Sequence, residues 1–385
     1  MKILGIETSC DETAAAIVED GSRILSNVVV SQIDIFAEYG GVIPEVAARS
    51  HLEVMMPVVE KALKDANCTW DDIDAIAVTY APGLLGSLLI GTLTARTLAI
   101  LHDKPLYAVH HLKSHIYANW LEQEIPENAH SRPSRDNGSE KSETLPITTG
   151  AREHVENKSF LSVPTFPLLA LVISGGHTQI LYMPAHNEFE IIGTTHDDAI
   201  GECFDKVAKI LGLPYPGGPS IAKAATNGDE NKYKLPHPKV DILDFSFSGL
   251  KTAVLRAVQK ELGLPISHPS HDLKNHLSEQ QVADFAASFQ KTAIDILLEK
   301  LAKASEQHPE ARSIVFAGGV SANQSLREMA ERSLQKNLSA FFPETKFSGD
   351  NGAMVAAAAY YEIQSGVEPT DPYKLNIYPR ISIEN

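Results

Sequence analysis

One order of secondary structure, three strands followed by alternating helices and strands, is expected twice along this sequence, and it constrains the fold more than any other feature. Short runs rich in Ile and Val predict the strands, and apolar residues at helical spacing predict the helices. In the first half the expected strands are 2–6, 13–19, 24–30, 74–79 and 105–109. The expected helices of this half are a long one after Pro44, then 86–101 and 111–121.

The second half repeats this order with different residues. Its expected strands are 168–173, 178–183, 189–193, 313–317 and 339–342. Its expected helices are 199–211, 278–305, 321–335 and 351–364. We therefore predict an α/β fold of two duplicated βββαβαβα domains with a central cleft, where ligands bind at the turns that follow the strands. A coincidental alternation of strands and helices is the alternative interpretation.

The predicted domains are residues 1–121 and 165–364, and residues 365–385 form a C-terminal tail. Residues 122–164 between them are polar, contain prolines and lack apolar periodicity, which is typical of a flexible insertion. Within the second domain, Gly- and Pro-rich turns in 214–275 interrupt the repeated order. Two further helices are expected in that insert, at about 219–226 and 249–261.

The acidic balance of the chain limits its partners. Lys and Arg number 33 against 49 Asp and Glu, for a formal net charge of -16. Binding to nucleic acid or to an anionic membrane usually needs clustered basic residues. We therefore do not expect the overall charge of this chain to attract either of them. A local basic patch remains compatible with this balance.

The cysteines and the apolar runs predict where the protein works. The cysteines Cys10, Cys68 and Cys203 are sparse and form no CxxC pair, which favours a reduced compartment. No apolar run reaches the roughly 18 residues of a membrane span, and the start MKILGIETS has no signal-peptide pattern. The sequence therefore predicts a soluble cytoplasmic protein without a membrane partner.

The turn after the first expected strand carries carboxylates. It contains Thr8, Ser9, Asp11 and Glu12, whose hydroxyls and backbone amides can cradle an anion. Asp11 and Glu12 can orient a metal, a water or a proton. A solvated hairpin with ordinary turn residues is the alternative.

Three further turns are rich in glycine. Ser174-Gly175-Gly176 follows a buried strand at the position that matches the first turn, so backbone can approach a ligand there. The turn 316–323 leads from a strand to a helix, with Ser321 as the expected N-cap and free N–H groups for a nucleotide. The third turn, 215–219, is by itself more typical of a plain rigid loop, and only the other turns favour a ligand contact there.

His111 and His115 are the first metal-ligand candidates. Residues four apart share one face of a helix, so both imidazoles can bind one ion. Asp350, at the matching helix entrance of the second half, is the best third ligand, and two His with one carboxylate suit Fe(II) or Zn(II). The alternatives are surface histidines and a helix-capping Asp. The glutamate of HExxH is missing, which excludes that zinc-protease arrangement.

A set of motifs, in order along nearly the whole chain, resembles one family closely. These are MKILGIETSCDET, PEVAARSH, APGLLGSLLIG, HHLKSH, SGGHTQI, DDAIGECFDKVAKILGLPYPGGP, FSFSGLKTAV, AGGVSAN and SGDNGAM. They look like the TsaD family of tRNA N6-adenosine threonylcarbamoyltransferases, which has the actin/Hsp70/sugar-kinase (ASKHA) fold. The resemblance implies transfer of threonylcarbamoyl from threonylcarbamoyl-AMP to N6 of adenosine 37 in tRNAs that read ANN codons, which forms t6A and releases AMP.

The resemblance also implies roles for particular residues. His111, His115 and Asp350 match the ligands of one Fe(II) or Zn(II) ion in the first domain and the cleft. Contacts to the adenylate in the second domain match Val172, Ile173, Ser174, Gly175, Gly176, Asp205, Gly218 and Asn323. As a hypothesis, Asp11 or Glu12 positions or deprotonates the attacking amine. TsaB-like and TsaE-like proteins are the implied partners, beside tRNA.

Three positions depart from the family pattern. The insertion 122–164 is longer than usual, and Ala222 stands where many bacterial members have an Asp that contacts the nucleotide sugar. The residues between the two histidines are Leu-Lys-Ser, where relatives often have Glu-Gly, and this leaves the ligands intact.

Three other functions compete with the transferase. An ATPase or small-molecule kinase of the same ASKHA fold would hold Mg(II) with carboxylates and would need no histidine pair. A metalloprotease would need the glutamate of HExxH as its general base, and this sequence lacks that glutamate. A catalytically silent scaffold like TsaB would not need the histidines and glycine turns that this chain keeps.

Overall fold

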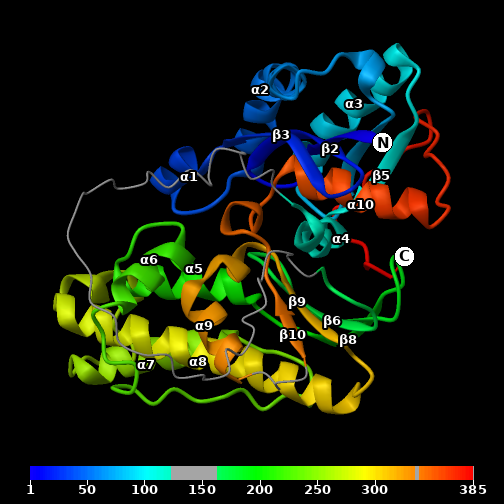
Figure 1. Ribbon diagram of the computed structural model, residues 1–385. Coiled ribbons are helices and arrows are strands. Elements are labelled where there is room, and N and C mark those ends of the chain that lie inside the picture. Colours follow the sequence, from blue (N-terminus) through cyan, green and yellow to red (C-terminus); the bar gives the residue numbers. More distant parts are fainter. Residues whose placement is uncertain (123–162, 334–337, 385) are drawn as a thin grey trace, which may run out of the picture.

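The computed structural model describes residues 1–122, 163–333 and 338–384, and it contains two five-stranded sheets (Figure 1). The first sheet has the order β3-β2-β1-β4-β5 and the second has the order β10-β9-β6-β7-β8. The first sheet consists of β1 (Lys2–Glu7), β2 (Glu12–Glu19), β3 (Arg23–Ser31), β4 (Ala75–Ala81) and β5 (Leu106–His110). The second consists of β6 (Leu168–Ile173), β7 (Thr178–Met183), β8 (Glu190–Thr194), β9 (Ser313–Ala317) and β10 (Ser339–Phe341).

The two sheets are built alike, strand for strand. In each, the first strand pairs antiparallel with the second and parallel with the fourth, and the fifth strand continues the parallel edge. The third strand pairs antiparallel with the second in both sheets. This shared topology confirms the predicted duplicated α/β fold.

Helices and sheets alternate in five layers (Figure 1). Helices α2 (Pro44–Asp65) and α3 (Leu85–His102) cover the outer face of the first sheet, and α4 (His111–Tyr117) and α10 (Gly352–Gln364) lie between the sheets. The far side of the second sheet is covered by a group of helices that pack on one another. They are α5 (Ile200–Leu211), α6 (Gly217–Ala225), α7 (Ser248–Glu261), α8 (Glu279–Gln307) and α9 (Gln324–Ser333).

Alternation along the strands separates the apolar cores of these layers. Leu4 of β1 packs with α2 and α3, whereas the adjacent Ile3 packs in the core that α4 and α10 share. In β6, Leu169 belongs to the outer core of the second sheet and Ala170 to the shared core. Successive side chains point to opposite faces of a strand, so each central strand is apolar on both faces.

Helix α10 lies with the first sheet, although it follows β10 of the second. It packs against β1, β2 and α4, and Gly352 at its start approaches the backbone of Gly5 and Ala15. The sequence-based division kept this helix in the second domain, because it follows that domain in the chain. The other boundaries of that division stay predictions, and most of the insertion 122–164 lies outside the described residues.

Two helix predictions need correction. The helix expected at 111–121 ends at Tyr117, and a 3-10 turn, Ala118–Trp120, follows it. Ser321 is not an N-cap, because it lies buried in the 3-10 turn Gly319–Ala322. The side chain of Asn323 accepts from the N–H of Leu326 instead and so caps α9. Helix α1 (Ile33–Tyr39) was not expected from the sequence.

Helix α3 is the one described helix whose length and apolar composition would allow a membrane span. Its residues Leu88, Ala95 and Leu98 are buried, and the helix contacts β4 and α2. The residues after α10 run back across the first sheet to the second. The N–H of Tyr378 donates to Tyr80, and Glu384 accepts from the N–H of Ile191 in β8.

Candidate active site

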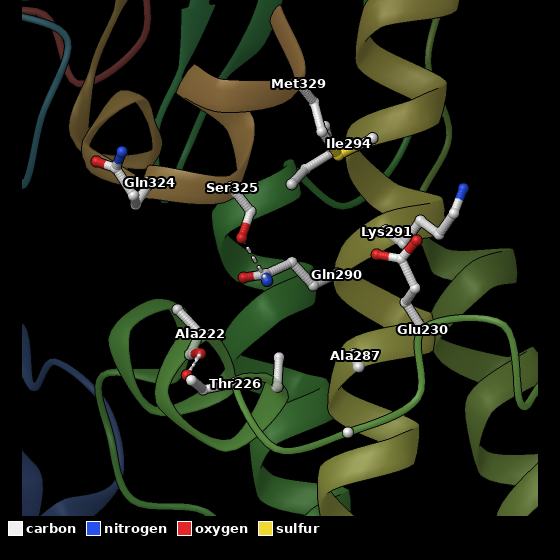
Figure 2. Close-up of a pocket in the computed structure, with 12 residues that line it drawn as sticks. Ala222, Thr226, Glu230, Ala287, Gln290, Lys291, Ile294, Gln324, Ser325 and Met329 are labelled. Atoms are coloured by element: carbon white, nitrogen blue, oxygen red, sulfur yellow. Dashed lines mark hydrogen bonds between the residues drawn. The ribbon is translucent and has the colours of Figure 1, made fainter. Parts of the chain in front are cut away.

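The described residues enclose two cavities that bear on function. A cleft of about 630 Å³ lies between the carboxyl ends of the strands of both sheets. A smaller cavity of about 310 Å³ lies among α6, α8 and α9 (Figure 2). The cleft is the place that the duplicated fold predicts for ligands, because the turns after β1, β6 and β9 meet there.

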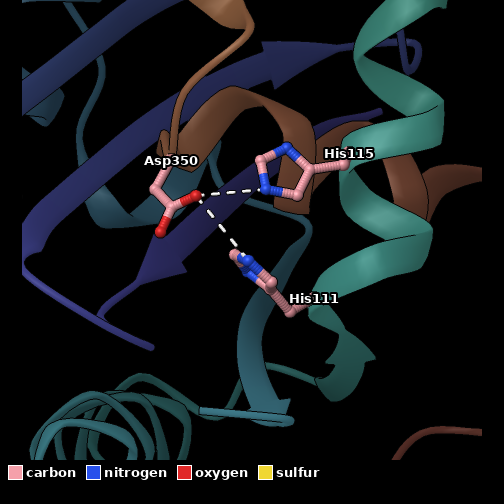
Figure 3. A group of neighbouring side chains, drawn as sticks. All are labelled: His111, His115 and Asp350. Atoms are coloured by element: carbon pink, nitrogen blue, oxygen red, sulfur yellow. Dashed lines mark ion pairs between the residues drawn. The ribbon is translucent and has the colours of Figure 1, made fainter. Parts of the chain in front are cut away.

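The three predicted metal ligands converge at the wall of this cleft (Figure 3). Nε2 of His115 lies 3.1 Å from Oδ1 of Asp350, and Nε2 of His111 lies 3.6 Å from the same oxygen. The histidines enter from α4 after β5, and the carboxylate enters from the loop after β10, the equivalent strand of the second sheet. Asn351, rather than Asp350, caps α10 by accepting from Met354, so the Asp350 carboxylate is free for another role.

Glu7, at the end of β1, holds the ring of His111. Its carboxylate lies 3.2 Å from Nδ1 of His111 and also accepts from the hydroxyl of Thr79 and the N–H of Ser9. The carboxyl of Glu7 is fully buried, so its orientation is set by these three groups. A carboxylate on Nδ1 places the ring proton there and leaves the Nε2 lone pair directed at the cleft.

His115 shows most directly that the site fits a metal. Both of its ring nitrogens are buried, and neither makes a hydrogen bond to any described residue. The contact of its Nε2 with Asp350 is an ion-pair distance without hydrogen-bond geometry. Buried polar atoms without partners are rare and costly. A cation between His111, His115 and Asp350 would give Nε2 of His115 a partner.

The charges around the histidines also favour a cation. Burial alone would lower the pKa of His111, but the carboxylates of Asp350 and Glu7 outweigh it and raise that pKa to about 9. Burial would raise the pKa of Asp350, but His111 and His115 lower it to about 2. The site thus stabilises positive charge between its carboxylates, which a divalent ion can supply in place of the ring proton.

Asp11 and Glu12 line the same cleft, in the turn after β1 and at the start of β2. Glu12 accepts from the hydroxyl of Ser31 at 3.1 Å. Burial, and then the charges of Asp350 and Asp11, raise the pKa of Glu12 well above its ordinary value. A carboxyl whose pKa is shifted toward neutrality is suited to hold and pass a proton.

The turn after β6 is tight and open to the cleft. The hydroxyl of Ser174 accepts from the N–H groups of Gly176 and His177 at 3.3 and 3.1 Å. Apart from chain neighbours, no atom of the described residues would come within 4 Å of a Cβ at Gly175 or Gly176. This space is therefore free for a ligand, as expected from the sequence for Ser174, Gly175 and Gly176.

Of the other predicted adenylate contacts, one lines the cleft and the rest do not. Asp205 lines the cleft, and its carboxylate accepts from the N–H of Gly217 at 2.6 Å. Val172 and Ile173 are fully buried within β6, so their side chains do not line the cleft. Gly218 lines neither cavity, although a Cβ there would meet open space.

Asn323 does not line the smaller cavity but contacts Gln290, which does (Figure 2). Its amide donates to Gln290 at 2.9 Å, and Gln290 donates to the hydroxyl of Ser325 at 3.0 Å. Gln290 and Ser325 line that cavity together with Ala222, the residue that replaces the Asp of many bacterial relatives. The methyl group of Ala222 can make no hydrogen bond, unlike the side chain of an Asp at this position.

Two residues of the site were missed from the sequence. The sequence analysis assigns no role to Glu7, and only its buried contact with His111 reveals one. Arg380 lies in a tail without apolar periodicity, yet it lines the cleft that Asp11, Glu202 and Asp350 also line. The motif YPRIS by itself gives no signal that would have placed this guanidinium there.

Comparisons with known proteins agree with this geometry. Residues 23–130 and 150–357 match the family model described as "TsaD: tRNA N6-adenosine threonylcarbamoyltransferase". A tRNA N6-adenosine threonylcarbamoyltransferase from Caldicellulosiruptor bescii is 44% identical over 384 residues, which cover 100% of this chain and 98% of the relative. Its counterpart from Symbiobacterium thermophilum is 44% identical over 367 residues, 95% of this chain and 92% of the relative.

One solved structure supports the fold alone. HypF from T. kodakarensis aligns with a TM-score of 0.55 at 14% sequence identity, over 95% of this chain and 48% of that one. At this identity, the likeness extends to the arrangement of the two sheets and their helices, and to nothing about chemistry.

Proposed function

Since this chain belongs to the TsaD family of tRNA N6-adenosine threonylcarbamoyltransferases and is a transferase that forms t6A on tRNA, we propose how its cleft carries out the reaction. The convergence of His111, His115 and Asp350 beside two glycine turns is the observation that carries this proposal. The donor is threonylcarbamoyl-AMP, the acceptor is N6 of adenosine 37 in ANN-decoding tRNAs, and AMP leaves.

His111, His115 and Asp350 would hold one Fe(II) or Zn(II) ion, with Glu7 fixing the ring of His111. When bound, such an ion supplies a Lewis acid for the carbamoyl carbonyl or the threonyl oxygens. Two imidazoles and one carboxylate suit both ions and leave positions open for substrate oxygens. The kinase alternative would use Mg(II), which prefers oxygen ligands, so this donor set favours the transferase.

The adenylate would lie along the second sheet's side of the cleft. The backbone of Ser174, Gly175 and Gly176 is open to a phosphate or ribose there. Asp205 lines this side of the cleft and contacts the start of α6, the helix that contains Gly218. Asn323 contacts Gln290 at the smaller cavity. Val172 and Ile173 support this turn from within β6 and contribute backbone alone.

Asp11 and Glu12 are the candidates for positioning or deprotonating the attacking amine. Both face the cleft that the metal ligands line, and the raised pKa of Glu12 suits a proton acceptor. Separate Asp11→Ala and Glu12→Gln variants should distinguish them, because the base should lower single-turnover transfer by roughly 10²–10⁴-fold. Wild-type transfer by both variants would remove the role from these carboxylates.

The acidic charge of -16 makes weak binding of tRNA by this chain alone the expectation. We therefore propose that TsaB-like and TsaE-like partners share the tRNA surface, in the cytoplasm. Apolar side chains four residues apart on the adjacent helices α2 and α3 offer a surface for the TsaB-like partner. They are Leu52, Met56, Leu85, Leu89 and Leu93.

Leu89→Glu tests this surface, because it places a charge at its centre. It should abolish the complex with the TsaB-like protein in size-exclusion chromatography and leave the thermal stability of the free chain unchanged. Leu101→Glu is the matched control, since Leu101 is 70% exposed on the same helix but lies outside this set. Equal binding by both variants would remove the surface from the proposal.

A further inference from the structure

A second group of two histidines and one carboxylate lies far from the cleft along the chain, between α7 and α8. Nε2 of His268 and Nε2 of His276 lie 2.9 and 3.0 Å from the same oxygen, Oδ2 of Asp272. The three residues are spaced four apart, within and beside the 3-10 helix Ser270–Asn275. Both imidazoles therefore converge on one point from either side of a carboxylate.

This arrangement has the same donor set as the cluster in the cleft. In each group, two imidazole nitrogens and one carboxylate oxygen lie within 4.8 Å of one another. In each, both histidines approach a single oxygen of the aspartate. Such donors favour Zn(II) and similar transition metals over Mg(II) or Ca(II), which prefer oxygen ligands.

The surroundings hold the three ligands in place. Asn275 donates to Oδ1 of Asp272 at 2.9 Å, which turns the other oxygen toward the imidazoles. Leu273 is fully buried and anchors the 3-10 helix, while the buried Gln259 of α7 donates to the carbonyl of His268 at 3.1 Å. Ligands fixed by such neighbouring hydrogen bonds bind metal more tightly than flexible ones.

The site is also accessible. The side chains of His268, Asp272 and His276 are 21%, 37% and 46% exposed, so an ion can enter and water can complete its coordination. We propose that His268, Asp272 and His276 form a second transition-metal site, of the Zn(II) class, that cross-links the connection between α7 and α8. The ion would take the place of the protons that now bridge the imidazoles and the carboxylate.

Zn(II) titration of the full chain against a competing chelator tests this site. Wild type should bind two equivalents, His115→Ala one, His276→Ala one, and the double variant none. His271→Ala is the matched control, because His271 is an exposed histidine of the same segment outside the group of three, and it should keep both equivalents. Co(II) binding, followed by its visible absorption, should give the same four stoichiometries.

Asp272→Asn is the second variant, and it should weaken the peripheral equivalent at least about 10-fold while the fold stays intact by circular dichroism. A His276→Ala protein that binds as much Zn(II) as His271→Ala overturns the proposal. If wild type binds one equivalent, and that equivalent is lost in His276→Ala but kept in His115→Ala, the result counts against the cleft site and supports the peripheral site. The two failures are therefore distinguishable.

Discussion

Nδ1 of His111 lies 3.2 Å from the carboxylate of Glu7, which is fully buried at the end of β1. This contact joins the first strand of the chain to the helix that carries both histidines. It sets which ring nitrogen of His111 bears the proton and which faces Asp350. The metal site is therefore built from three elements, β1, α4 and the loop after β10.

Glu7→Gln should weaken metal binding by roughly 10- to 100-fold, because the neutral amide holds the proton of His111 less firmly at Nδ1. The measurement is the Zn(II) or Fe(II) affinity of the full chain by chelator competition. Glu202→Gln, at a cleft carboxylate that pairs with Lys206 and not with a histidine, should bind metal as wild type does. An unchanged affinity in Glu7→Gln would show that Glu7 does not position His111.

Gly175→Ala should weaken binding of the adenylate and leave the free energy of unfolding nearly unchanged. Its Cβ would meet no atom of the described residues within 4 Å, apart from its chain neighbours, so we expect the clash to be with a ligand in the cleft. The KM for threonylcarbamoyl-AMP and a urea denaturation curve measure the two effects. Gly249→Ala is the control, because that glycine is equally open but lies on α7 outside the cleft. An equal KM in both variants would move the adenylate away from the turn after β6.

Gly318→Ala should destabilise the protein, because two constraints act at this glycine. Its φ of +88° disfavours any side chain, and a Cβ would lie 2.5 Å from the carbonyl oxygen of Ile173. We expect a loss of about 1–3 kcal/mol in the free energy of unfolding. Gly319→Ala, next to it in open space and without positive φ, should lose little. A loss of unfolding free energy in Gly318→Ala as small as that in Gly319→Ala would show that the packing of β9 against β6 tolerates a methyl group.

Glu362 predicts a pH dependence of stability. Burial raises the pKa of this α10 carboxyl to about 7, against an ordinary 4.5, although the charge of Lys113 opposes the rise. The folded protein then holds a proton that the unfolded chain releases, so stability falls as pH rises from about 4.5 to about 7. The full loss corresponds to roughly 3 kcal/mol.

Glu362→Gln should therefore be more stable than wild type at pH 8 and similar to it at pH 4. Urea denaturation curves at these two pH values measure the difference. Glu368→Gln, at an exposed carboxylate six residues on, should follow wild type at both. A Glu362→Gln variant that loses stability with pH as steeply as wild type would assign the effect to another group.

The repeated strands could be predicted because alternation and β-branched runs are local signals, and the observed strand bounds lie within two residues of the expected ones. The position of α10 on the first sheet could not, because chain order says nothing of which sheet a helix returns to. Ser321 was wrongly expected as a cap, since a 3-10 turn shifts the start of α9 to Gln324.

The metal ligands were the part of the site that could be predicted from the sequence. The spacing of His111 and His115 is visible in the sequence, and the repeat places Asp350 opposite them. Glu7 and Arg380 could not be predicted, because Glu7 acts through a contact with the distant His111 and Arg380 reaches the cleft only through the path of the C-terminal tail. The adenylate contacts stay predictions, with Val172 and Ile173 limited to their backbone by burial.

The most direct test of the account is single-turnover transfer. The metal-loaded chain is incubated with threonylcarbamoyl-AMP and unmodified ANN-decoding tRNA, with and without TsaB-like and TsaE-like partners, and the tRNA nucleosides are analysed by mass. We predict t6A and AMP in equal amounts with wild type, and at least about 100-fold less t6A with His115→Ala that retains its fold. Absence of t6A under every condition with the metal site loaded, or full transfer by His115→Ala, would contradict the account.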